Sequence, residues 1–102
     1  MNAKHINIVG LERKTGKIIA FGTILIVNEV LDGKVGKIEN IVTCKSVRGK
    51  GLGRTVIDVL KMEGWREGCE VIGLFCEEHN IKFYERLGFK TEGMISDYRS
   101  TS

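Results

Sequence analysis

Residues 48–53 read Arg-Gly-Lys-Gly-Leu-Gly and lead into an amphipathic segment that continues to Trp65. Three glycines beside the cations Arg48, Lys50 and Arg54 indicate a tight basic turn that opens a helix. The first backbone N–H groups of a helix have no partner within the helix, and the positive end of its dipole lies behind them. The turn therefore predicts a binding site for a phosphate or a diphosphate. A plain helix start with solvated cations is the alternative that the motif alone leaves open.

The whole-chain composition excludes several classes of partner. The 102 residues carry a net charge of +3, with 28% charged and 42% hydrophobic residues, as is ordinary for a globular domain. This mild charge, without a basic stripe that alternates with aromatic residues, indicates no nucleic-acid partner. No segment is apolar over a membrane-spanning length and the N-terminus has no signal-peptide pattern, so we expect no membrane partner and a cytoplasmic location. The length predicts a single domain over residues 1–102.

The cysteines and histidines give no pattern of a metal site. Cys44, Cys69 and Cys76 are odd in number and lack metal-ligand spacing, so we interpret them as free buried thiols in a reducing compartment. His5 and His79 have no neighbours that suggest a catalytic triad or a metal, and we expect both on the surface. No metal cofactor is predicted.

Three strands are predicted before the glycine turn. Residues 5–11 and 17–27 are rich in β-formers and flank Thr15-Gly16, which indicates an antiparallel hairpin. Residues 28–37 are polar and contain glycine, so they are expected to form a loop. The third strand is predicted over residues 38–43, Ile-Glu-Asn-Ile-Val-Thr.

The glycine turn is followed by a predicted helix over residues 53–66 that ends near Gly68. Its apolar positions recur near helical spacing: Val56, Ile57, Leu60 and Met62. Residues 71–76 form a fourth strand, residues 77–87 a short helix ending at Gly88, and residues 89–98 a final strand. Trp65, Phe83 and Phe89 are expected in the core. This order of elements predicts a mixed sheet with helices packed on it, an α/β (α+β) fold.

Four segments of the chain resemble the GNAT superfamily of acyl-CoA-dependent N-acetyltransferases. The turn at 48–53 is similar to the superfamily's Q/R-x-x-G-x-G/A signature, and the similarity extends in order and spacing over residues 36–89. Besides the turn, the similar segments are Ile-Glu-Asn-Ile-Val-Thr at 38–43, Gly-Cys-Glu-Val-Ile-Gly-Leu-Phe-Cys at 68–76 and Glu-Glu-His-Asn-Ile-Lys-Phe-Tyr-Glu-Arg-Leu-Gly-Phe at 77–89. Within the superfamily, these segments are most similar to the branch that acetylates glucosamine 6-phosphate. The resemblance implies the acyl-CoA N-acyltransferase fold, a mostly antiparallel sheet whose central strands splay apart.

The resemblance also implies the reaction. An enzyme of this type transfers the acetyl group of acetyl-CoA to the amine of glucosamine 6-phosphate by direct attack in a ternary complex, on the route to UDP-N-acetylglucosamine. Glu39 matches the catalytic carboxylate, acting directly or through a water molecule, and Tyr84 matches the tyrosine that faces the thioester sulfur. A phenol has a pKa of about 10 and a thiol of about 8.5, so Tyr84 is expected to hydrogen-bond the thiolate rather than transfer its proton fully. A backbone N–H near Val42 is the candidate donor to the oxyanion.

The resemblance further implies the binding residues. The coenzyme would contact the third strand, the glycine turn and the second helix: Ile41, Val42, Thr43, Arg48, Gly49, Lys50, Gly51, Leu52, Gly53, Arg54, Asn80 and Phe83. The acceptor would contact Glu39, Asn40, Phe75, Cys76 and Arg99, with Arg99 on the sugar phosphate.

The sequence departs from the family pattern at the acceptor side. Asn40 and Phe75 stand where the family has acidic residues, which weakens the attraction for an ammonium group. An N-acetyltransferase for another amine, such as a peptide or a polyamine, is therefore one alternative. A catalytically weak acyl-CoA-binding module is another.

The resemblance begins at the second strand of the superfamily fold, without the first strand and the first pair of helices. We therefore expect a partial N-acetyltransferase domain. An uncovered sheet face and edge promote association, so we also expect a homodimer. In the family, too, paired subunits build the sugar-phosphate site together.

Overall fold

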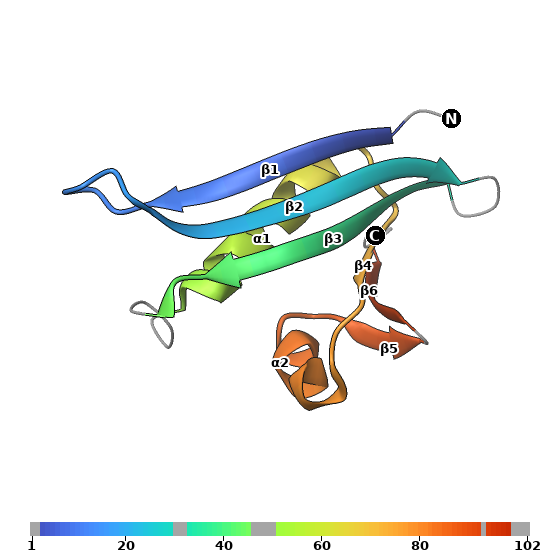
Figure 1. The fold of residues 1–102 in the computed structure, drawn as a ribbon. Helices are drawn as coiled ribbons and strands as arrows, with labels where there is room; N and C mark the ends of the chain where they lie inside the picture. Colours follow the sequence, from blue (N-terminus) through green and yellow to red (C-terminus); the bar gives the residue numbers. More distant parts are fainter. Residues whose placement is uncertain (1–2, 30–32, 46–50, 93, 99–102) are drawn as a thin grey trace.

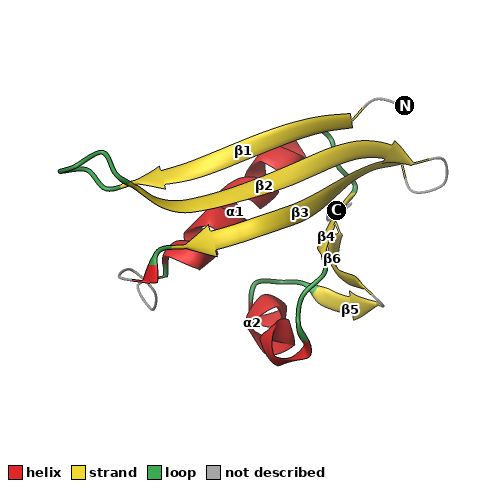
Figure 2. Cartoon of the chain, in the orientation of Figure 1, coloured by secondary structure: helices red, strands yellow, loops and turns green. Residues whose placement is uncertain are grey.

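The computed structural model describes residues 3–29, 33–45, 51–92 and 94–98. In these ranges the chain forms a mixed sheet in the order β1-β2-β3-β4-β6-β5, and helix α1 runs along one face of the three long strands (Figure 1). The elements are β1 Ala3–Leu11, β2 Ile18–Glu29, β3 Gly33–Thr43, α1 Leu52–Arg66, β4 Val71–Leu74, a 3-10 turn Glu78–Asn80, α2 Ile81–Arg86, β5 Lys90–Glu92 and β6 Met94–Tyr98. Figure 2 shows the shorter α2 next to β5.

The central strands of the sheet separate soon after they meet. β1, β2 and β3 pair antiparallel, as do β4, β6 and β5. The two groups are joined by a parallel pairing of β3 with β4 that runs only from the Val35–Val71 pair to the Lys37–Gly73 pair. Beyond Lys37, β3 continues to Thr43 without β4 beside it. The predicted splay of the central strands is thereby confirmed.

The predicted hairpin and long helix are confirmed. The β1–β2 turn has Gly16 at φ 71°, and its N–H donates to the Glu12 carbonyl at 2.8 Å. Helix α1 buries three of the four apolar positions of the helical pattern, Val56, Ile57 and Leu60, whereas Met62 is 52% exposed. Met62 lies two positions after Leu60, so helical geometry turns it away from the buried face.

The loop predicted over residues 28–37 is wrong. β2 extends to Glu29 and β3 begins at Gly33, and residues 30–32 lie outside the described residues. The glycine at 36 serves packing instead of a turn, because a Cβ there would lie 2.7 Å from Cδ1 of the buried Ile24. The polar side chains belong to the exposed side of the strand, where Lys37 pairs with Glu29 at 3.4 Å.

The C-terminal elements are shorter than predicted. The strand expected over 71–76 ends at Leu74, and the helix expected over 77–87 is the 3-10 turn followed by α2. Gly88 follows α2 at φ 98°, as expected for a helix end. The single strand expected over 89–98 is two strands, because β5 and β6 pair antiparallel with Glu92 opposite Met94. The chain therefore reverses between them.

The expected aromatic core is only partly confirmed. Phe89 is buried, and Trp65 is half-buried against the core. Phe83 is 39% exposed, so its assignment to the core was wrong. It lies on α2, a helix without buried residues of its own, where neighbouring elements cover little of its surface.

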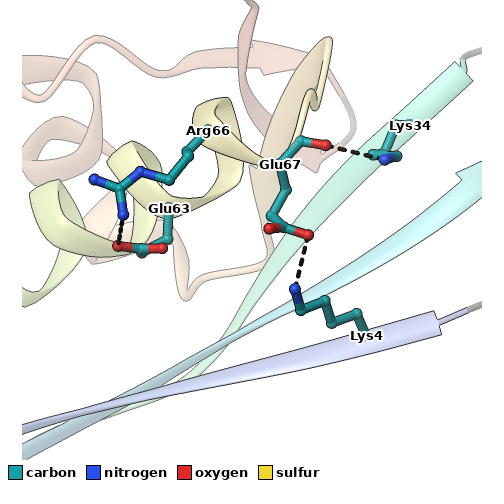
Figure 3. A network of polar contacts seen from close by, with 5 residues as sticks. All are labelled: Lys4, Lys34, Glu63, Arg66 and Glu67. Atoms are coloured by element: carbon teal, nitrogen blue, oxygen red, sulfur yellow. Dashed lines mark hydrogen bonds and ion pairs between the residues drawn. The ribbon is translucent and has the colours of Figure 1, made fainter.

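A polar network joins the end of α1 to the long strands (Figure 3). The Glu67 carboxylate accepts a hydrogen bond from Lys4 Nζ at 3.0 Å, and the Glu67 carbonyl accepts one from Lys34 Nζ at 3.0 Å. Arg66 pairs with Glu63 on the helix itself at 3.4 Å. Exposed pairs contribute little free energy of unfolding. Their effect is to align α1 with β1 and β3 at the end of the sheet opposite the glycine turn.

Candidate active site

A cleft of about 550 Å³ opens where β3 and β4 diverge. One wall comes from β3, and the other from the end of β4, the segment after it and α2. The lining residues are Ile38, Glu39, Asn40, Ile41, Leu74, Phe75, Cys76, Glu77, Glu78, Asn80 and Tyr84. The cleft therefore brings together residues from both sides of the glycine turn in the sequence.

A β-bulge shapes the β3 wall. Thr23 pairs with Glu39 and Phe21 pairs with Val42, so the single residue Gly22 faces two residues of β3. The first of the two, Asn40, has φ 56°, and it is the only non-glycine residue with positive φ among the described residues. Bulges bend a strand and re-aim its side chains. Here the bulge lies at the level where β4 has left β3, and it places Glu39 and Asn40 on the cleft wall.

Glu39 has an exposed carboxylate that lines the cleft. Within the described residues, none of the ion pairs includes it. A carboxylate in this state can accept a proton from an amine that enters the cleft.

Tyr84 lies on the opposite wall and is held by two aromatic rings. Its ring makes edge contacts with Phe83, at 5.1 Å between centroids, and with Phe89, at 5.9 Å. Burial raises the pKa of the Tyr84 hydroxyl, and the neighbouring Cys76 raises it further. The hydroxyl therefore stays protonated at neutral pH and can donate a hydrogen bond.

Cys76 is a poor nucleophile in this cleft. Burial raises the pKa of its thiol, and the nearby charge of Glu77 adds to the effect. Only the thiolate attacks efficiently, so a protonated thiol does not favour a covalent acyl-enzyme. The arrangement suits direct attack by the acceptor. Of the other two thiols, Cys69 is buried and Cys44 is half-buried.

The glycine turn is described from Gly51 onward. Gly51 has φ 77° and precedes the first turn of α1, which has neither a side-chain cap nor an acidic residue. The Thr55 hydroxyl donates to the Gly51 carbonyl at 3.1 Å, and Arg54 lies 3.9 Å from Asp58. Among the described residues, no side chain caps the N–H groups of this turn, which is compatible with the predicted anion site. Arg48, Gly49 and Lys50, and also Arg99, lie outside the described residues.

The cleft collects seven of the fourteen predicted site residues that the structure describes. Glu39, Asn40, Ile41 and the C-terminal wall residues line it, whereas Phe83 does not. Val42 and Thr43 line a smaller apolar hollow of about 180 Å³ beside β2. The end of β3 is close to the helix start, since a Cβ on Gly53 would be 3.9 Å from Thr43 Cγ2.

Sequence reasoning missed two carboxylates, Glu77 and Glu78, that line the cleft. The path of the chain after β4 places them there. The available signal was their position directly after a buried strand, since residues at strand ends beside a splay face the opening.

The model of the Acetyltransferase (GNAT) family matches residues 2–89, which is most of the chain. The chain belongs to this family. The predicted GNAT fold, with its mixed sheet and helices, is thereby confirmed.

This GNAT chain is similar to several enzymes of known name. It is 42% identical over 89 residues to glucosamine 6-phosphate N-acetyltransferase 1 of Dictyostelium discoideum, covering 85% of this chain and 57% of that protein. It is 35% identical over 92 residues to glucosamine 6-phosphate N-acetyltransferase of Arabidopsis thaliana, covering 88% of this chain and 62% of that protein. The chain thus spans less than two thirds of the length of these relatives.

The fold of this GNAT chain has a solved counterpart. The crystal structure of glucosamine-6-phosphate N-acetyltransferase from Arabidopsis thaliana superposes with a TM-score of 0.82 at 32% identity, over 96% of this chain and 65% of that chain. In the described part of the chain, no helix is both long and apolar enough to cross a membrane. Those same residues contain no group of three or more potential metal ligands.

Proposed function

We propose that this chain is an acetyl-CoA-dependent N-acetyltransferase that acetylates the amine of glucosamine 6-phosphate, on the route to UDP-N-acetylglucosamine. The observation that carries the proposal is the position of Glu39 and Tyr84 on opposite walls of one cleft. The similarity to enzymes named for this substrate supports the choice of acceptor.

The described residues fit acetyl-CoA as the cosubstrate. Beyond Lys37 the β4-facing edge of β3 has no strand partner among the described residues, so its backbone groups can pair with an extended pantetheine arm. The uncapped first turn of α1 after Gly51 suits the diphosphate. The proposed coenzyme residues are Ile41, Val42, Thr43, Arg48, Gly49, Lys50, Gly51, Leu52, Gly53, Arg54, Asn80 and Phe83. Acetyl-CoA supplies an acetyl group activated as a thioester.

Each of three groups of the chain has its own role in the direct transfer of the acetyl group. Glu39 takes the proton of the attacking amine, directly or through one water molecule. A backbone N–H near Val42 donates a hydrogen bond to the carbonyl oxygen as negative charge develops on it. The protonated Tyr84 hydroxyl donates a hydrogen bond to the departing thiolate, which lowers the cost of separating that charge.

The acceptor side of the proposal comprises Glu39, Asn40, Phe75, Cys76 and Arg99, with Arg99 assigned to the sugar phosphate. Asn40 and Phe75 stand at positions that are acidic in the family pattern, so this chain lacks two carboxylates there. Two other carboxylates, Glu77 and Glu78, line the same cleft. Negative charge that attracts an ammonium group is therefore retained there.

A thiol-release assay with acetyl-CoA and glucosamine 6-phosphate tests the proposal. We expect release that requires both substrates and that falls about 100-fold in Glu39→Gln, the order expected for loss of a general base. Glu29→Gln, an exposed strand carboxylate outside the cleft, is the matched control and should keep the full rate. Full activity in Glu39→Gln would contradict the assigned role.

One observation favours a second acceptor class. The cleft lining contains the carboxylates Glu39, Glu77 and Glu78 but no lysine or arginine among the described residues. Such a lining suits an acceptor with several amines and no phosphate, such as a polyamine or a basic peptide. Faster acetylation of spermidine than of glucosamine 6-phosphate would favour this alternative. Acyl-CoA binding without release to either acceptor would indicate a weakly catalytic binding module.

The proposal includes a homodimer in the cytoplasm, without a nucleic-acid or membrane partner. β1 lies at the edge of the sheet, and no described strand pairs with its outer side. Apolar side chains are exposed at the hairpin end of the sheet, at Val9, Leu11, Ile18 and Val42. Edges and patches of this kind favour association with a second copy. Thiols that include the buried Cys69 are compatible with a reducing compartment.

A further inference from the structure

Phe75 is exposed to an unusual degree for its size. Its side chain is 80% exposed, more than any other large hydrophobic residue that the structure describes. All four residues of β4 that precede it are buried. A phenylalanine left in water forgoes the apolar burial that normally stabilises a fold. Packing within the described fold therefore does not explain why a phenylalanine stands at position 75. Its place on the cleft wall points to a role in binding.

Phe75 and the proposed base Glu39 line the two walls of the same cleft. The last parallel pair joins Lys37 of β3 to Gly73 of β4. Glu39 and Phe75 are each two residues further along, and both line the cleft. Glu39 belongs to β3, and Phe75 directly follows Leu74, the last residue of β4. An acceptor that fills the cleft can therefore meet both side chains.

We infer that Phe75 is a specificity-determining residue, whose ring packs against the carbon face of the hexosamine that carries the amine. This inference rests on the proposed function and deepens it by naming the group that selects a ring-shaped acceptor. A pyranose presents C–H groups on one face, and an aromatic ring gains by covering such a surface. An apolar wall beside the amine also disfavours its charged form, so the neutral nucleophile is favoured.

The charges around Phe75 complement this role. Glu77 and Glu78 follow it closely in the chain and line the same cleft. They attract the protonated amine toward the opening, while the apolar ring forms the surface on which the sugar rests. Residue 75 is acidic in the family pattern, so this chain replaces one charge by an apolar contact and keeps acidic side chains two and three residues further along.

The test compares two acceptors that differ in the ring. Glucosamine 6-phosphate has an amine, a phosphate and a pyranose, whereas O-phosphorylethanolamine has the amine and the phosphate alone. In Phe75→Ala we expect the KM for glucosamine 6-phosphate to rise about tenfold, the order expected when contact with one ring face is lost. The KM for acetyl-CoA and the KM for O-phosphorylethanolamine should change by less than about twofold.

Two further variants separate a binding role from a structural one. Phe75→Tyr keeps the aromatic face and should retain the KM of the wild type for the sugar. Met62→Ala removes another exposed apolar side chain, 52% exposed on α1 and outside the cleft, and should leave the KM for both acceptors unchanged. An unchanged KM in Phe75→Ala, or an equal rise for both acceptors, would overturn the inference.

Calorimetric titration of glucosamine 6-phosphate into the CoA-loaded protein distinguishes this inference from the proposed function. If Phe75→Ala raises the Kd for the sugar phosphate about tenfold, the role of Phe75 in binding is supported, even when no thiol is released. In that case the absence of thiol release overturns only the proposed function. Wild-type protein that does not bind the sugar phosphate overturns the inference.

Discussion

Tyr84 shows how its surroundings assign a chemical role to one side chain. Its ring makes edge contacts with Phe83 and Phe89, and burial together with Cys76 raises the pKa of its hydroxyl. A group held neutral in this way serves as a hydrogen-bond donor and not as a base. Cys76 is itself held protonated by burial and by Glu77. This state of Cys76 is consistent with the proposed direct attack by the acceptor amine.

Replacement of Tyr84 by phenylalanine should lower kcat about 10-fold to 100-fold, because the departing thiolate loses its donor. The KM for the acceptor should stay nearly constant, since the hydroxyl acts on the leaving group. In the wild type, the pKa of Tyr84 lies above its ordinary value, so the neutral donor persists through neutral and mildly alkaline pH and is lost only at still higher pH. The assignment would be contradicted if kcat of the wild type declined near neutral pH and this decline were absent in Tyr84→Phe.

Substitutions at Asn40 should destabilise the fold when the new side chain disfavours left-handed backbone. Its φ of 56° suits asparagine and glycine but not β-branched residues. Asn40→Val should lower the free energy of unfolding by about 1–2 kcal/mol, whereas Asn40→Gly should be close to neutral. Urea denaturation measures both. Asn28→Val, on an exposed strand position without positive φ, is the control and should retain stability.

Among single residues, the sequence predicted those that a motif identifies. Glu39 and Tyr84 lie in segments that resemble the family, and the structure places both on the cleft. Glu77 and Glu78 could not be placed from pattern, because their position depends on where β4 ends and how the chain leaves it. The left-handed backbone of Asn40 is also a tertiary feature, set by the bulge against β2.

At the level of elements, the contact between α1 and β2 supports the bulge. Gly22 faces the bulge and lies beneath the helix, where a Cβ would be 2.7 Å from Val56 Cγ1 and 2.9 Å from Cδ1 atoms of Ile41 and Leu60. The glycine permits the helix to approach the sheet at the point where β3 bends. Helix packing and site geometry are therefore coupled at this position.

Gly22→Ala should lower the free energy of unfolding by about 1–3 kcal/mol, because the added methyl overpacks the interface between α1 and the sheet. The matched control is Gly53→Ala, whose added Cβ would make only an ordinary contact of 3.9 Å with Thr43. Alanine is also the better helix former, so this control should be neutral or stabilising. Equal unfolding midpoints in urea for Gly22→Ala and the wild type would contradict the packing account.

Elements with strong local sequence signals were predicted correctly. Predictions were wrong where strand pairing overrides the local signal. The β1–β2 hairpin and α1 follow from a glycine turn and from helical spacing of buried residues. Residues 28–37 were expected to form a loop because of their glycines and charges, yet β2 and β3 pair through most of them. There Gly36 is required by its contact with Ile24, which only the packed sheet reveals.

Across the whole molecule, two groups of strands meet through a short parallel pairing. β1, β2 and β3 carry α1 on one face, and β4, β6 and β5 continue the sheet on the other side of the cleft. The cleft of the candidate active site is thus a consequence of topology, since it opens where the two groups diverge. The same architecture leaves the outer side of β1 without a described strand partner.

We expect a homodimer, with a mass by light scattering close to twice 11.4 kDa. Burial of the exposed apolar side chains at the hairpin end of the sheet supplies the driving force. Val9→Lys, which places a charge on the exposed face of β1, should shift the equilibrium toward the monomer. A well-folded wild-type monomer at micromolar and higher concentrations would contradict the expected association.

The most direct test of the central claim is a map of backbone amide NMR shifts during sequential titration. We expect CoA to shift the amide signals at the end of β3, from Ile41 to Thr43, and at the start of α1, from Gly51 to Arg54. Glucosamine 6-phosphate added afterwards should shift Glu39, Phe75 and their neighbours in the cleft. Shifts confined to the β1–β2 hairpin, or no shifts at saturating coenzyme, would contradict the claim that the divergence of β3 and β4 forms the active site.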